Sequence, residues 1–106
     1  MGPRPWRPGA ELEQALERGD LRYAVALAEE VRVERGKPIE LGTAARFLPL
    51  IAAASPAEYD AYALRWLARW VSETGTATIE QAAEIAASLA DLPVEPRMLD
   101  SITATL

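Results

Sequence analysis

The chain has 106 residues, of which half are hydrophobic and a quarter charged, and it carries a formal net charge of -5. This composition and length are typical of one compact domain with a buried apolar core. The acidic balance argues against a protein whose main task is to neutralise nucleic-acid phosphates. The sequence contains neither cysteine nor histidine, which excludes disulfides, thiol nucleophiles, thiolate metal sites and imidazole general bases.

The opening residues, MGPRPWRPG, carry arginine and proline where a secretory signal has an apolar run. No apolar segment approaches the ~20 residues that a membrane-spanning helix requires. We therefore expect a cytoplasmic protein without a membrane span. Because proline prevents regular helix formation, residues 1–9 are predicted to form a disordered tail and residues 10–106 a single helical domain.

The next part of the chain shows helical periodicity with recognisable ends. A short helix from Ala10 is predicted to stop at Gly19, and Asp20 then caps a second helix. The apolar positions of that second helix recur every three or four residues: Leu21, Ala24, Val25, Leu27, Ala28 and Val31. Residues 43–54 are predicted to form a third helix. Pro49 should kink or break it near residues 47 and 48, because proline removes a backbone hydrogen bond.

Two capping signals then begin the fourth and fifth helices. In SPAE, Ser55 is predicted to cap a helix that runs to about residue 73, with Glu58 reaching back to the backbone of Ser55. In TIEQ, Thr78 and Gln81 form the same signal for a helix that ends before Pro93. The apolar face predicted for this fifth helix consists of Ile79, Ala82, Ile85, Ala86 and Leu89.

A last short helix is predicted to open at Pro96. No segment has the alternating pattern of a strand. The fold class is therefore predicted to be all-α, a compact bundle of five or six short antiparallel helices, with stacked helix pairs as the other arrangement that satisfies the pattern.

Most aromatic residues fall in the fourth helix. At ~100° per residue its apolar side chains cover an arc of about 200°: Tyr59, Tyr62, Ala63, Leu64, Trp66, Leu67, Trp70 and Val71. An arc of this width predicts a central helix packed on two sides. The alternative is that the rings exceed what short alanine-rich helices need in a core, and that they extend outward to anchor a partner.

Arg65 and Arg69 lie one helical turn apart, and Arg46 comes from the preceding helix. Together they could bind a phosphate or the carboxylates of a partner. The alternative is that Arg65 and Arg69 form the exposed strip of an otherwise buried helix and pair with neighbouring acidic side chains. No helix carries the dense set of basic and amide side chains that reads base edges.

The stretch ALERGDLRYAVALAEE resembles the helix pairs of tetratricopeptide and ankyrin repeats, although it covers about one pair and lacks the full signature. The stretch from YDAYALRWLARWVSETG to TIEQAAEIAASLADLP is similar to short, uncharacterised helical proteins of GC-rich bacteria. The second resemblance implies an all-helical fold and carries no activity, ligand or functional residue.

We therefore expect a non-enzymatic module that binds another protein or a second copy of itself, without catalytic, cofactor-binding or metal-binding residues. The candidate contact residues are Tyr59, Tyr62, Trp66, Trp70, Arg65 and Arg69. Two alternatives stay open. One is a small nucleic-acid-associated regulator that uses Arg46, Arg65 and Arg69, and the other is a small-molecule site between the aromatic helix and its neighbours.

Overall fold

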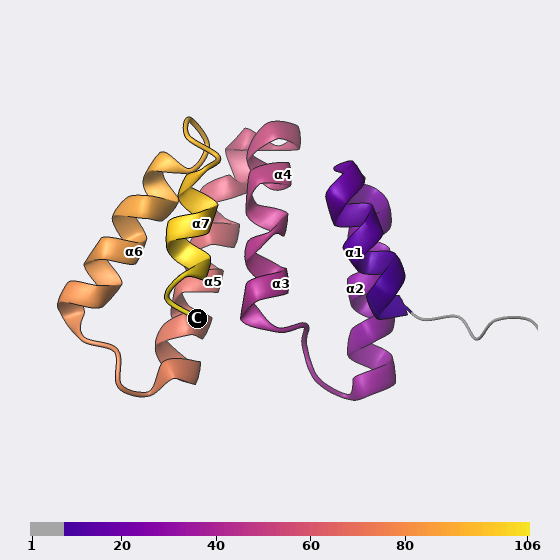
Figure 1. Cartoon of the computed structure of the whole chain (residues 1–106), viewed down its shortest axis with the longest axis horizontal. Coiled ribbons are helices and arrows are strands. Elements are labelled where there is room, and N and C mark those ends of the chain that lie inside the picture. The colour runs from indigo at the N-terminus through magenta and orange to yellow at the C-terminus, as the bar shows by residue number, and fades with distance from the viewer. Residues whose placement is uncertain (1–7) are drawn as a thin grey trace, which may run out of the picture. The chain divides into compact units, whose positions relative to one another are not determined.

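A computed structural model describes residues 8–106, and this part of the chain is all-helical, as predicted (Figure 1). The helices are α1 (Pro8–Arg18), α2 (Leu21–Arg35), α3 (Leu41–Ala45), α4 (Phe47–Ala54), α5 (Pro56–Thr74), α6 (Ile79–Asp91) and α7 (Met98–Thr103). These segments correspond to the six predicted helices, because the predicted third helix is divided in two. None of them is long and apolar enough to cross a bilayer.

The chain divides into two compact units, one up to Ile39 and the other from Glu40 to Leu106. The single domain predicted over residues 10–106 stays a prediction. The predicted disordered tail lies, over residues 1–7, outside the described residues. Its last two residues are helical, because α1 begins at Pro8 rather than at Ala10. Proline suits the first position of a helix, where its missing N–H would have no partner.

The first unit is a helical hairpin formed by α1 and α2. Gly19 has a positive φ of 73°, which lets the chain reverse between the helices. Asp20 then accepts a hydrogen bond from the Tyr23 N–H at 3.3 Å, as the predicted cap requires. The buried side chains of the hairpin are Leu12, Ala15, Leu16, Ala24, Leu27 and Val31. The prediction that Val25 belongs to this face is wrong, since its side chain is exposed.

In the second unit, α3 and α4 are separated at Arg46, one residue before the predicted break. The Arg46 N–H donates to the carbonyl of Thr43 at 3.1 Å, which tightens the last turn of α3. Pro49 is consequently the third residue of a new helix. The N–H groups of the first turn have no partner within a helix, so proline removes no helical hydrogen bond there.

Ser55 ends α4 and precedes α5, and it does not cap α5 with its side chain. Its N–H already donates to the carbonyl of Ile51 at 2.7 Å. That N–H is therefore occupied, and the predicted return contact from Glu58 is wrong. Thr78, by contrast, confirms its prediction: its hydroxyl accepts from the Gln81 N–H at 3.1 Å, and the Gln81 side chain accepts from the Thr78 N–H at 3.0 Å.

Because Thr78 caps α6 and Ser55 does not cap α5, replacing each with alanine should change the free energy of unfolding by different amounts. Thr78→Ala should lower the free energy of unfolding by about 1 kcal/mol, because it removes the acceptor of the Gln81 N–H. Ser55→Ala is the matched control and should change it by less than about 0.5 kcal/mol, because its hydroxyl makes no capping bond. Urea unfolding followed by circular dichroism measures both. Equal losses would contradict the assignment of the cap.

Within the second unit, α5 packs against α3, α4 and α6, while α7 packs against α3 and α6. Figure 1 shows α6 and α7 side by side in this unit. Leu92 and Ile102 are fully buried, and they fix the end of α6 and the short α7 to the core. Ile79, predicted on the apolar face of α6, is instead 89% exposed. It lies about 120° from the buried Ile85 on the helix, too far round to share its contacts.

Candidate interaction surface

Three of the four aromatic side chains of α5 fill the core of the second unit. Tyr59, Trp66 and Trp70 are 3%, 5% and 4% exposed. The prediction of a core helix is confirmed for these rings. Whether they also contribute to contact with a partner stays a prediction. In the structure these rings pack α5 against α3, α4 and α6.

The Tyr59 hydroxyl donates to the carbonyl of Leu89 in α6 at 2.5 Å. In an unbroken helix this carbonyl would accept from the N–H four residues later, but that residue is Pro93, which has no N–H. The tyrosine therefore satisfies a buried acceptor that the sequence of α6 leaves without its helical donor. This contact joins the N-terminal half of α5 to the C-terminal end of α6.

Burial raises the pKa of Tyr59 to about 12, and the nearby Asp60 carboxylate adds to the shift. Both effects favour the neutral phenol. The hydroxyl consequently keeps its proton and remains a donor to Leu89.

Trp66 makes the second polar contact of the aromatic helix. Its Nε1–H donates to the carbonyl of Leu41, the first residue of α3, at 3.0 Å. The indole thus has a partner for its single donor, as a buried tryptophan requires. Since Tyr59 bonds to α6 and Trp66 to α3, α5 is fixed at two points along its length.

Tyr62 and Arg65 of α5 lie at the surface, and Arg69 is half-buried. Tyr62 is 42% exposed, and the Arg65 guanidinium stacks over its ring at 4.5 Å from the centroid. Arg69 forms an ion pair with Glu73 one turn later. Each arginine therefore has a partner on α5 itself. Arg46, the third residue of the proposed phosphate site, links α3 to α4. The nucleic-acid alternative stays a prediction, and no contact described here favours it.

The prediction that the whole apolar arc of α5 lies in the core is wrong for Tyr62, Leu64 and Val71, which are 42%, 64% and 42% exposed. The helices that contact α5 cover the side that carries the buried rings, and Leu64 and Val71 lie at ~120–140° from Tyr59 on the helix. They belong to a row of five exposed residues, which we call the outer seam: Ala57, Ala61, Leu64, Ala68 and Val71. The outer seam is therefore an apolar surface on the side of α5 opposite its buried face.

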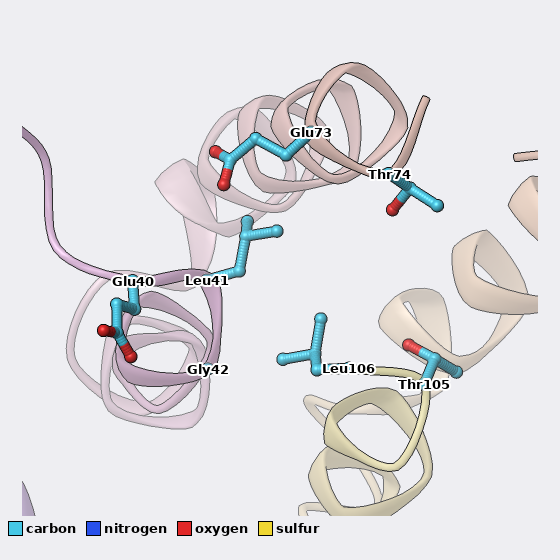
Figure 2. A pocket seen from close by; sticks show the side chains of 7 residues that line it. All are labelled: Glu40, Leu41, Gly42, Glu73, Thr74, Thr105 and Leu106. Carbon is cyan, nitrogen blue, oxygen red and sulfur yellow. The ribbon is translucent and has the colours of Figure 1, made fainter. Parts of the chain in front are cut away.

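A shallow cleft of about 430 Å³ lies between the start of α3, the end of α5 and the C-terminal residues. In Figure 2, Leu41 and Glu73 lie on one side of it and Leu106 and Thr105 on the other. The Glu40 carboxylate points away from the cleft in this view, and Glu73 is already paired with Arg69. The cleft has the volume of a small-molecule site, and the Thr105 hydroxyl in its lining already donates to the carbonyl of Ile102 at 2.7 Å. The small-molecule alternative stays a prediction.

Within residues 8–106 no group of three or more acidic side chains is placed to hold a metal ion. The expectation that the chain has no catalytic or cofactor-binding residue stays a prediction. Comparison with protein-family models, with curated proteins and with solved structures gave no match.

Proposed function

We propose that the chain is a cytoplasmic, non-enzymatic protein–protein interaction module, acting by self-association or as a small adaptor. The outer seam of α5 is the observation that carries this proposal. It places Leu64 and Val71 in contact with water on a helix whose other side is tightly packed. Removing such apolar surface from water is favourable, and contiguous exposed apolar residues are typical of contact sites.

The packed core holds α5, and with it the outer seam, in a fixed position. Tyr59 fixes the helix to α6 and Trp66 fixes it to α3. A contact surface on a fixed helix loses little conformational entropy when a partner binds. The buried rings thus serve binding indirectly, because they hold the outer seam in position.

The polar side chains of α5 are already engaged in structural contacts. The Tyr59 hydroxyl donates to Leu89, Arg65 stacks on Tyr62, and Arg69 pairs with Glu73. Groups held in this way are poorly suited to act as acid, base or nucleophile, since each would have to leave its partner first. These contacts favour binding over catalysis as the role of α5.

The proposal predicts that a charge in the outer seam abolishes association. Immobilised full-length chain should retain a protein from an extract of the native host, or a second copy of itself, and Leu64→Lys should lose at least 90% of the retained protein. Val94→Lys is the matched control, because Val94 is 85% exposed and lies outside α5. A chain that stays monomeric and retains no protein would contradict the proposed function.

A further inference from the structure

We propose that the partner of the outer seam is a second copy of the chain, bound with the two α5 helices antiparallel. This inference rests on the proposed function and names the partner for it. It follows from the spacing, the side-chain sizes and the charges along the exposed side of α5.

The spacing of the outer seam is that of a coiled coil. Its residues follow one another at intervals of four, three, four and three, from Ala57 to Val71. This repeat places Ala61 and Ala68 at one core position of a heptad, and Ala57, Leu64 and Val71 at the other. All five are exposed. The row extends along ~21 Å of helix, and its first four residues, from Ala57 to Ala68, form a ~17 Å line that can face the same four residues of an antiparallel second copy.

Residue sizes along the seam fit a second copy running in the opposite direction. When the two-fold axis passes between Ala61 and Leu64, each Ala61 faces Leu64 of the second copy, and each Ala57 faces Ala68 of the second copy. Every one of these layers contains at least one alanine, so no layer sets two large side chains against each other and the helices can approach closely. A parallel pair would instead set Leu64 against Leu64 and Ala61 against Ala61, with an uneven separation.

Charges beside the seam favour the same arrangement. Glu58 and Arg65 are exposed, lie on the same flank and are seven residues apart. The antiparallel two-fold places Glu58 of each copy beside Arg65 of the other, which forms two equivalent ion pairs. Within residues 8–106 the Glu58 carboxylate has no ion-pair partner. On the other flank, Asp60 faces the apolar Leu67 of the second copy and forms no ion pair. A substitution of Asp60 should therefore leave the dissociation constant of the antiparallel dimer unchanged.

The experiment is light scattering on the full chain from about 1 µM to about 1 mM, with a dissociation constant expected on the order of micromolar. We expect wild type and Val94→Lys to form a dimer with the same dissociation constant. Leu64→Lys should weaken the dimer at least 10-fold with unchanged circular dichroism, because Leu64 contributes little to the core. Glu58→Lys should also weaken it, Asp60→Lys should not, and Glu58→Lys combined with Arg65→Glu should restore it.

The remaining outcomes each overturn a specific part of the inference. A dimer that Leu64→Lys leaves intact would show that the outer seam is not the contact. Weakening by Asp60→Lys but not by Glu58→Lys would show parallel helices, which bring Asp60 and Arg65 together. A monomer that retains a different protein through Leu64 would exclude the second copy and leave the proposed function standing. A monomer that retains no protein would overturn both.

Discussion

Replacing Trp66 with alanine is expected to lower the free energy of unfolding by about 3–5 kcal/mol. The indole is 5% exposed, so its removal leaves a large cavity in the core of the second unit. The substitution also removes the donor to the Leu41 carbonyl, which ties α3 to α5. Chemical unfolding followed by circular dichroism measures the loss without relying on the deleted fluorophore.

Two controls separate the causes of this loss. Trp66→Phe keeps an aromatic ring in the cavity but not the Nε1–H, so its loss should be clearly smaller than that of Trp66→Ala. Leu64→Ala, on the opposite side of the same helix, should cost the monomer less than about 0.5 kcal/mol because the side chain is mostly exposed. Similar losses for Trp66→Ala and Leu64→Ala would contradict the assignment of the two sides of α5.

Tyr59→Phe is expected to lower stability at neutral pH by about 1–3 kcal/mol and to reduce its dependence on alkaline pH. The first effect follows because the Leu89 carbonyl loses its donor in a buried position. The second follows from the pKa of Tyr59, which is about 12 in the folded protein and 10 for an ordinary tyrosine. Between these values the folded chain holds a proton that the unfolded chain has released.

The stability that Tyr59 contributes is therefore fully present below pH ~10 and is lost as the pH rises towards 12. Urea unfolding of wild type and Tyr59→Phe at several pH values above 8 should show a difference that shrinks as the pH increases. Tyr62→Phe is the control for removal of a tyrosine hydroxyl, since Tyr62 is 42% exposed, and its loss of stability at neutral pH should be small. A difference between wild type and Tyr59→Phe that does not change with pH would contradict the buried, neutral phenol.

The helix ends and the buried rings were accessible to sequence reasoning, because they depend on local chemistry. Gly19 and the Thr78–Gln81 pair act within a few residues of themselves, and the helical repeat places Tyr59, Trp66 and Trp70 on one side. Ser55 satisfies the same local rules, yet its hydroxyl makes no capping bond to α5. The return contact from Glu58 is also missing, because the Ser55 N–H already donates to the carbonyl of Ile51, a competition that the local pattern does not reveal.

Other features depend on contacts that are distant in sequence. Exposure of Leu64 and Val71 depends on which sides of α5 the other helices cover, and an apolar arc alone does not specify this. The cleft brings together residues 40–42, 73–74 and 105–106. The sequence does indicate that the Leu89 carbonyl needs a donor from outside its helix, because Pro93, four residues later, has no N–H. In the structure this donor is the Tyr59 hydroxyl.

The most direct test of the two sides of α5 is tryptophan fluorescence with iodide quenching on chains in which Trp6→Phe leaves only Trp66 and Trp70 as emitters. Both rings are buried inside the second unit, whereas the proposed contact lies on the outer seam. We therefore expect blue-shifted, weakly quenched emission that is the same with and without Leu64→Lys, measured at a concentration where that variant is monomeric. Red-shifted, readily quenched emission in that monomer, with protection on association, would show instead that the rings themselves are the contact surface.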